Sequence, residues 1–147
     1  YDLKTKLKFN VSHSGNMAVI GFVLNDDIGV DIEEVLRFQR LVKNAHFMKR
    51  VFTPKEISYC RSKKNPLQHF AVRFAAKEAA LKALGGNVPG FTWHDVQVSG
   101  DSGNPPQLLL TGAALERAGD SGATSWHLSL SHDKGMAVAF VVMEGDR

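Results

Sequence analysis

The sequence predicts an α+β domain in which an antiparallel sheet packs on one long helix. Three observations support this prediction. Short apolar or alternating runs typical of strands stand near both ends of the chain. A long helical pattern lies between them. The 147 residues, 44% hydrophobic and 22% charged, have the size and composition of one globular domain with a real core.

The first third of the chain predicts three strands. Residues 2–9 alternate polar and apolar side chains, 10–15 indicate a turn, and 17–24 form an apolar run typical of a buried strand. After a turn signal at 25–27, residues 28–32 predict a third strand. Strand alternation places Asp31 on one face with Gly29 and, where the strand continues, with Glu33.

The middle of the chain predicts helices. Apolar residues at helical spacing indicate one helix over 38–52. Thr53-Pro54-Lys55-Glu56 has the pattern of a capping box with proline at the first helical position. Asn65-Pro66 starts the long helix in the same way, and Gly85-Gly86 ends it with a left-handed cap.

The last third predicts a strand over 91–98, a turn over 100–106, a short strand over 108–110 and a small helix or loop over 112–122. A closing hairpin follows, with strands over 126–130 and 136–143.

An internal repeat relates the two ends of the chain. Residues 11–19 align with 130–138 at one fixed offset, with Ser, His, Met, Ala and Val at coincident positions. Two interpretations stay open. The hairpins have similar composition only, or they are related and each presents a histidine at a turn beside a shared site.

Three carboxylates, Asp31, Glu33 and Glu78, are predicted at positions where a charge needs a partner. Glu78 falls on the apolar stripe of the long helix, which consists of Leu67, Phe70, Ala71, Phe74 and Leu81. A buried carboxylate is costly unless it is paired or bound to a cation. Lys82 lies one turn further on and is a possible partner, whereas Asp31 and Glu33 on the strand could simply face solvent.

Together, Asp31, Glu33 and Glu78 would form an all-oxygen site that suits Mg²⁺. Arg73 and Lys77 lie on the same helix, either as phosphate contacts or as a solvated basic face. Carboxylates, a metal ion and basic side chains are the groups used in phosphoryl transfer.

Two spaced motifs, residues 29–33 and 73–83, resemble the 4′-phosphopantetheinyl transferases, and the Phe52–Glu56 motif and the Leu128–His132 ending fit the same pattern. The resemblance covers roughly residues 28–142, and there the chain is most similar to the small holo-acyl-carrier-protein synthases. Residues 9–15 resemble a motif of the larger, surfactin-synthetase-type transferases, which are pseudo-dimers of two related halves. We therefore expect one domain over 1–147, consisting of an extra N-terminal hairpin (1–27) and a synthase-like module (28–147).

The resemblance implies a transfer of 4′-phosphopantetheine from coenzyme A to a serine of an apo acyl or peptidyl carrier protein, with Mg²⁺ and release of 3′,5′-ADP. By motif position, the metal ligands are Asp31, Glu33 and Glu78, and the catalytic residues are Asp31, Glu78 and Lys82. Coenzyme A contacts are expected from His13, or from His132 of a neighbouring subunit, and from Arg73, Lys77 and Lys82.

The partner implied is an acidic carrier protein, with Arg37, Arg40 and Lys43 as the docking residues. The net charge of +3 is too mild to indicate nucleic acid, and no apolar run is long enough to span a membrane. A single cysteine, Cys60, and no visible signal peptide favour the cytoplasm. Trimer, monomer and part of a larger synthase stay open, as does a non-catalytic module that binds coenzyme A or a nucleotide.

Overall fold

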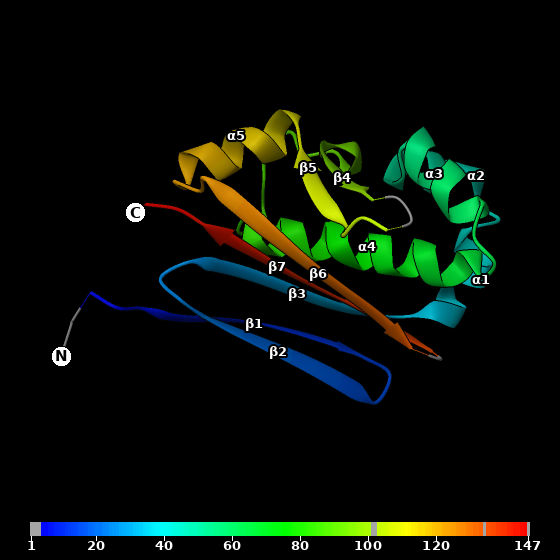
Figure 1. Ribbon diagram of the computed structural model, residues 1–147, viewed down its shortest axis with the longest axis horizontal. Helices are drawn as coiled ribbons and strands as arrows, with labels where there is room; N and C mark the ends of the chain where they lie inside the picture. The colour runs from blue at the N-terminus through cyan, green and yellow to red at the C-terminus, as the bar shows by residue number, and fades with distance from the viewer. Residues whose placement is uncertain (1–3, 101–102, 134, 147) are drawn as a thin grey trace.

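The computed structural model describes residues 4–100, 103–133 and 135–146. A three-stranded antiparallel sheet in the order β3–β7–β6 lies under one long helix, α4 (Pro66–Ala83), as Figure 1 shows. The strands are β3 (Asp27–Glu34), β6 (Ser125–Asp133) and β7 (Met136–Glu144). This arrangement confirms the predicted α+β fold with an antiparallel sheet on a long helix.

An N-terminal hairpin of β1 (Leu7–Ser14) and β2 (Met17–Leu24) lies on the side of β3 away from α4 (Figure 1). The predicted turn at 10–15 is wrong, because the strand continues through Ser14 and the chain turns at Gly15 and Asn16. The predicted strand over 2–9 therefore lies too early, and residues 2–3 lie outside the described residues. The predicted strand over 17–24 is confirmed, but it is not buried, since one face of β2 is exposed.

The predicted helix over 38–52 is two short helices, α1 (Phe38–Leu41) and α2 (Ala45–Val51), preceded by a 3-10 turn η1 (Val35–Arg37). The break has a local cause: the Asn44 side chain accepts a hydrogen bond from the Phe47 backbone and caps α2. Helix α3 (Pro54–Arg61) begins at the predicted capping box, in which Thr53 and Glu56 exchange bonds with each other's backbone.

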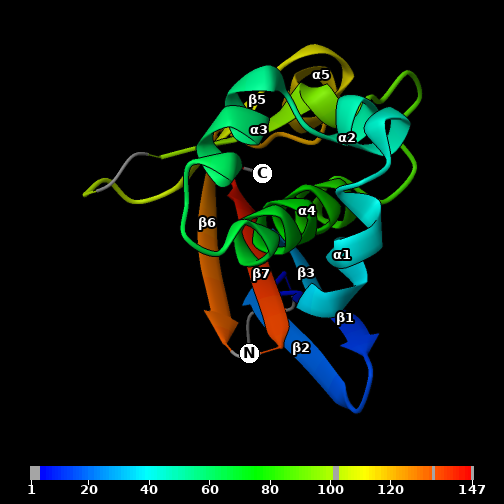
Figure 2. The ribbon, with the colours of Figure 1, turned by 90° about the vertical axis from the view of Figure 1, so that its right-hand side faces the viewer.

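Helix α4 ends as predicted at Gly85 and Gly86, both of which have positive φ. Figure 2 shows α4 between the sheet below and α2, α3, β5 and α5 above. Alanines at 75, 76, 79 and 80 are fully buried and let neighbouring elements approach the helix from both sides. None of the helices in the described ranges combines the length and apolar character needed to cross a membrane.

The segment above α4 consists of a 3-10 turn η2 (Trp93–Asp95), strands β4 (Val96–Ser99) and β5 (Gln107–Leu110), and helix α5 (Gly112–Asp120). Only the second half of the predicted 91–98 strand forms, because Thr92 and Asp95 cap a helical turn first. The predicted turn over 100–106 includes residues 101–102, which lie outside the described residues. The short strand, the small helix and the closing hairpin are confirmed.

Candidate active site

Two carboxylates on β3 face helix α4. Asp31 and Glu33 share the face of Gly29, as the alternation predicts, and both are buried. Gly29 makes this close approach possible, because a Cβ at that position would lie 1.7 Å from the backbone oxygen of Ala79. The helix therefore lies directly over the carboxylates and removes them from water.

The N-terminal hairpin holds the other edge of β3 through side chains. The Asn10 Oδ1 atom accepts a hydrogen bond from the Val30 backbone N–H at 2.9 Å, and Ser12 Oγ accepts one from the Ile32 N–H at 3.1 Å. Ser12 Oγ in turn donates to Asp31 Oδ1 at 3.2 Å. These bonds fix Asp31 from the hairpin side and satisfy the otherwise unpaired edge of the strand.

Lys82 links helix, strand and hairpin. Its Nζ atom donates to the backbone oxygen of Val30 at 2.9 Å and lies 3.5 Å from Asp31 Oδ1 and from the Val11 oxygen. The ammonium is partly exposed, so it neutralises Asp31 and still faces solvent. The predicted pairing with Glu78 across one helical turn is not among the ion pairs of the described residues, because Lys82 turns toward β3.

Burial strongly perturbs these carboxyl groups. Loss of solvent raises the pKa of Glu33 to about 8, and a hydrogen bond and repulsion from Asp31 add to the shift, whereas Arg37, 2.9 Å away, opposes it. Burial also raises the pKa of Asp31, against the opposing effects of Glu33, Lys82 and Ser12. The pKa of Glu78 is raised by burial and then by Asp31. The three groups therefore share one electrostatic environment.

The cluster fits a divalent cation in part. Asp31 Oδ2 is buried and has no hydrogen-bond partner among the described residues. A buried polar atom without a partner destabilises the fold, and a bound cation would remove this penalty. Within the same residues, no three carboxylate, imidazole or thiol groups converge closely enough to form a metal site by themselves. A cation here would need further oxygen ligands from water or from a bound phosphate, as Mg²⁺ commonly does.

The interpretation of Lys77 as part of a solvated helix face is wrong, whereas its contact with coenzyme A stays a prediction. The Lys77 Nζ atom is fully buried, lies 2.8 Å from Glu56 Oε1, and donates to the backbone oxygens of Trp93 and Val96. Glu56 accepts from the Thr53 and Val98 backbone N–H groups as well. Every donor and acceptor of this pair faces a protein group, because β4 and α3 cover this side of α4.

Arg73 is also buried, so it does not belong to a solvated helix face. Its guanidinium lies over the Tyr59 ring at 4.0 Å, and its Nε atom has no hydrogen-bond partner within the described residues. Arg73 and Tyr59 line an open cavity of about 430 Å³. Lys55, Gln97 and Asn104 also line it. A buried cationic nitrogen at a polar cavity is suited to a phosphate or a nucleotide base.

His13 and His132, which are aligned in the internal repeat, have different environments. His132 packs against α4, with its ring 5.8 Å from that of His69, which in turn contacts Tyr59. His13 is exposed and lies on the face of β1 opposite Ser12, by strand alternation. In this chain, His132 therefore lies beside the group around Arg73, and the structure does not bring His13 against the carboxylates.

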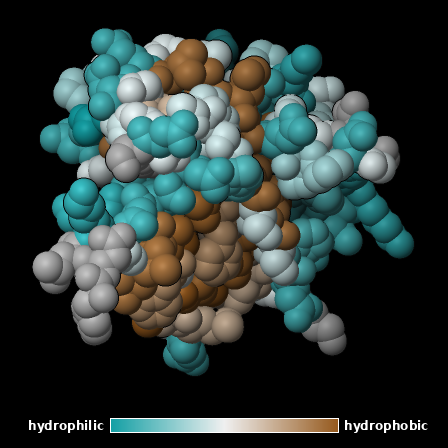
Figure 3. All heavy atoms as spheres, turned by 60° about the vertical axis from the view of Figure 1, so that its left-hand side comes forward, coloured by the Kyte–Doolittle hydropathy of each residue, from teal (hydrophilic) through white to brown (hydrophobic). Residues whose placement is uncertain are grey.

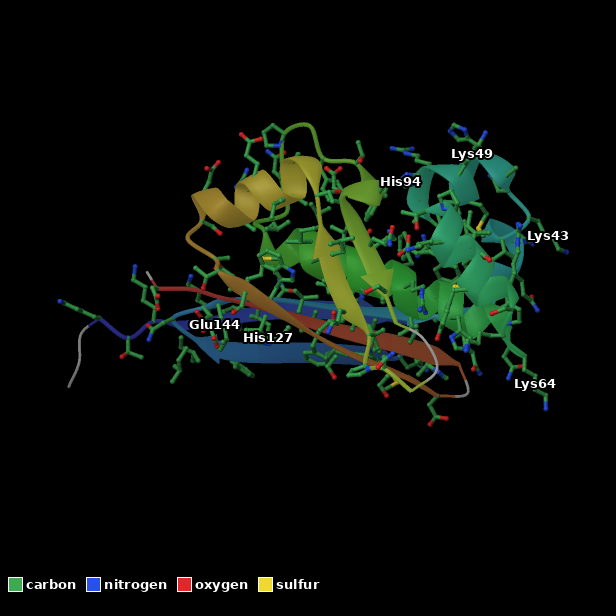
Figure 4. All side chains as sticks on the ribbon, turned by 45° about the horizontal axis from the view of Figure 1, so that its top comes forward. Lys43, Lys49, Lys64, His94, His127 and Glu144 are labelled. Carbon is green, nitrogen blue, oxygen red and sulfur yellow. The ribbon has the colours of Figure 1, made fainter. Side chains whose placement is uncertain are left out.

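The predicted docking residues lie at the α1 end of the molecule. Arg37, Arg40 and Lys43 are all exposed, although Arg37 also pairs with Glu33. Figure 4 shows Lys43, Lys49 and Lys64 projecting from this same end. Leu36, which is 68% exposed, adds an apolar side chain beside them.

Sequence reasoning missed Asn10, Ser12, Glu56 and Tyr59. Asn10 and Ser12 were assigned to a turn, and Glu56 was assigned only to a helix cap. The alternation of Asn10 and Ser12 with apolar Phe9 and Val11 is a strand signal that could have placed both side chains on one face. No local pattern indicates that Glu56 reaches Lys77.

Comparison with known proteins agrees with the fold. The sequence model of the 4′-phosphopantetheinyl transferase superfamily matches residues 27–141. Holo-[acyl-carrier-protein] synthase of Geotalea daltonii is 50% identical over 119 residues, which cover 79% of this chain and 95% of the relative. The corresponding protein of Koribacter versatilis is 44% identical over 119 residues, which again cover 79% of this chain and 95% of the relative.

Solved structures give the same result. Holo-[acyl-carrier-protein] synthase from Neisseria meningitidis superposes with a TM-score of 0.71 at 31% identity, over 80% of this chain and 97% of that one. The Helicobacter pylori synthase in complex with coenzyme A gives 0.68 at 32% identity, over 80% and 99%. With a superfamily match across most of its length, this chain belongs to the 4′-phosphopantetheinyl transferase superfamily.

Proposed function

We propose that this protein is a holo-acyl-carrier-protein synthase, which transfers 4′-phosphopantetheine from coenzyme A to a serine hydroxyl of an apo acyl or peptidyl carrier protein and releases 3′,5′-ADP. The observation that carries the proposal is the buried Asp31–Glu33 pair under α4, with Glu78 and Lys82 beside it, on the fold shared with the synthases.

Asp31, Glu33 and Glu78 would hold Mg²⁺, with Asp31 Oδ2 as the free buried ligand and with diphosphate oxygens and water completing the shell. The bound ion would neutralise the diphosphate and stabilise charge in the transition state. Gly29 and α4 exclude water from this side of the site. Ser12 and Lys82 hold Asp31 in one orientation.

Glu78 is the proposed general base. Its raised pKa makes its carboxylate a better proton acceptor near neutral pH than an ordinary glutamate. The carrier serine hydroxyl attacks the β-phosphorus of coenzyme A, and its proton passes to a Glu78 carboxylate oxygen directly or through one water. The bond from the β-phosphorus to the bridging oxygen breaks, and 3′,5′-ADP leaves. Lys82 Nζ stabilises the charge on the transferring group.

Coenzyme A would extend from the carboxylates toward basic groups on α4. Arg73 is the proposed phosphate contact, because its buried Nε atom lacks a partner beside the 430 Å³ cavity. Lys82 remains a contact for the diphosphate. We also propose His132 of this chain or a neighbouring one, or His13, as a further contact.

The proposed partner is an acidic carrier protein that docks on Arg37, Arg40 and Lys43 around exposed Leu36. Opposite charges would speed the encounter and weaken it in salt, while Leu36 would add apolar contact. Residues 28–147 would act as the synthase module, and 1–27 as an added hairpin of the same domain. Both a trimer and a monomer are compatible with this proposal.

The test is mass spectrometry of a panel of apo carrier proteins incubated with the full chain, coenzyme A and Mg²⁺. We expect one carrier to gain the mass of phosphopantetheine and 3′,5′-ADP to accumulate in equal amount. Reactions without coenzyme A, or with a chelator, are the controls.

The second candidate is a non-catalytic module that binds coenzyme A or a nucleotide, which the cavity at Arg73 favours. It predicts calorimetric binding of coenzyme A without a mass gain on any carrier. That result would overturn the transferase proposal.

A further inference from the structure

A cavity lies where helix α4 ends, and we call it the hairpin cavity. Lys82, Leu84 and Gly85 line it from α4 and the turn that follows, and Lys8 and Asn10 line it from β1. Its volume is about 270 Å³. Figure 3 brings this side of the molecule forward and shows apolar side chains in the lower part, bordered above by hydrophilic ones. The cavity therefore lies at the junction of the N-terminal hairpin with the rest of the domain.

Lys82 connects the hairpin cavity to the carboxylates. Its Nζ atom lies 3.5 Å from Asp31 Oδ1 and donates to the Val30 backbone oxygen at 2.9 Å. Asn10 reaches the same residue from the hairpin, because its Oδ1 atom accepts a hydrogen bond from the Val30 N–H. A phosphate bound at Lys82 and Asp31 would therefore lie next to the hairpin cavity.

Two cavities lie toward opposite ends of α4, and Glu78 stands between them in the sequence. The cavity at Arg73 is nine residues before Lys82, which is roughly 13 Å along the helix axis. In coenzyme A, the diphosphate joins a nucleotide to a pantetheine arm. The proposed function assigns a phosphate contact to Arg73, so the arm would extend in the other direction, toward Lys82 and the hairpin cavity.

The lining of the hairpin cavity suits a neutral chain better than a nucleotide. Ile28 and Leu84 provide a buried apolar wall. Lys8 is paired with Asp27 at 3.0 Å, and the Arg117 guanidinium donates to a backbone oxygen at 2.7 Å, so both cations already have partners. The pantetheine arm has a pair of methyl groups, a hydroxyl and two amides, which match an apolar wall with a few polar groups at its edge.

The wall contributed by β1 lies outside the region that matches the superfamily. The match begins at residue 27, whereas Lys8 and Asn10 belong to the N-terminal hairpin. The bonds from Asn10 and Ser12 to the backbone of β3 fix this wall in position. The hairpin cavity is therefore a feature of this chain that depends on its N-terminal hairpin.

We propose that the hairpin cavity binds the pantetheine arm of coenzyme A, so that the N-terminal hairpin contributes to substrate binding. This inference rests on the proposed function, which supplies coenzyme A as the substrate. At about 270 Å³ the cavity is smaller than the ~300–1,000 Å³ of pockets that enclose a whole drug-sized ligand, so it holds the arm alone. The methyl groups pack on Ile28 and Leu84, and the amides and the hydroxyl face Lys8, Asp27 and Ser121.

The experiment is calorimetry of the full chain with coenzyme A and, separately, with 3′,5′-ADP, both with Mg²⁺. The two ligands differ by the phosphopantetheine, so the comparison separates the arm from the nucleotide. Ser121→Trp fills the cavity from the end of α5 and should weaken coenzyme A binding at least about tenfold, with 3′,5′-ADP binding unchanged. Asp120→Trp is the matched control and should change neither, since Asp120 is the neighbouring residue but is not among those that line the cavity.

Lys8→Trp fills the cavity from the hairpin and should have the same selective effect. Lys6→Trp is its control, because Lys6 precedes β1 and is exposed. Circular dichroism confirms that all four variants fold.

An equal loss of both ligands in Ser121→Trp and Lys8→Trp would assign the cavity to the nucleotide and overturn the inference, as would unchanged coenzyme A binding in both. A wild type that binds no coenzyme A would overturn the inference and the proposed function together. A selective loss of coenzyme A binding, with no carrier labelled by the wild type, would support the inference and contradict the transferase proposal alone.

Discussion

Helix α4 has charged groups on two of its sides, and the two groups are built differently. On one side, Lys77 and Glu56 are fully buried, and every polar atom of the pair faces a protein partner. On the other side, Asp31, Glu33 and Glu78 are crowded together with raised pKa values, and Asp31 Oδ2 has no partner among the described residues. In the first group every polar atom has a partner within the protein. In the second group Asp31 Oδ2 has none among the described residues, so the group is suited to an added cation.

This difference separates structure from function. A closed ion pair contributes to a unique packing of α3, α4 and β4 and leaves no atom for a ligand. An unsatisfied carboxylate cluster lowers stability but creates a site for a cation and a phosphate. Substitutions on the two sides of α4 should therefore have opposite effects on stability and on transfer.

The largest expected effect is on stability. Lys77→Met should lower the free energy of unfolding by about 3–5 kcal/mol, because it leaves Glu56 buried without its cation. The KM for coenzyme A of the folded fraction should not change. Urea unfolding measures the loss, and adding Glu56→Gln should restore part of it. A loss under about 1 kcal/mol would contradict a structural role for the pair.

The opposite pattern is expected at Asp31. Asp31→Asn should reduce carrier labelling about 10²- to 10³-fold, the usual cost of removing one electrostatic contact to a reacting group. Unfolding should need the same or more urea, because the variant buries no charge. Quantitative labelling assays and urea titrations on one preparation test both parts. Full activity would show that Asp31 holds no essential cation.

A smaller effect is expected at Ser12. Ser12→Ala removes the hydrogen bond to Asp31 and should weaken both transfer and Mn²⁺ binding about tenfold. Ser131 occupies the aligned position in the C-terminal hairpin and is exposed, so Ser131→Ala is the matched control. Ser12→Thr should restore Mn²⁺ binding, measured by calorimetry. Equal losses in the two alanine variants would refute a positioning role for Ser12.

The smallest expected effect is a dependence of the free energy of unfolding on pH. The folded pKa of Glu33 is about 8 and its unfolded value is near 4.5, so the folded state binds the proton more tightly. Without divalent cations, stability should therefore fall as pH rises from about 4.5 to 8, by at most about 1.4 kcal/mol per unit. Glu33→Gln should flatten this slope in urea titrations. An equal slope in the variant would assign it to other groups.

The fold was predictable where a pattern is local. The Thr53–Glu56 box, the Asn65-Pro66 start and the Gly85-Gly86 stop each depend on a few neighbouring residues, and all are confirmed. The prediction of one helix over 38–52 was wrong. The apolar pattern continues through Asn44, but the Asn44 side chain hydrogen-bonds to the backbone and starts a new helix there.

The site was predictable only in part. Alternation places Asp31 and Glu33 together correctly, since the register of one strand decides it. Lys77 could not be assigned, because its environment depends on Glu56 and Val96, which reach it through tertiary packing. Helical periodicity also assumes one buried side, and alanine-rich α4 is covered on more than one.

The attachment of β1 to β3 has a consequence for redesign. The two strands share no backbone ladder among the described residues, and Asn10 and Ser12 make the connection instead. A strand fastened by side chains can be gained or lost without rebuilding the hydrogen-bonded sheet that it joins. The hairpin could therefore be exchanged or redesigned as a unit, while the Ser12 hydroxyl group keeps it coupled to Asp31.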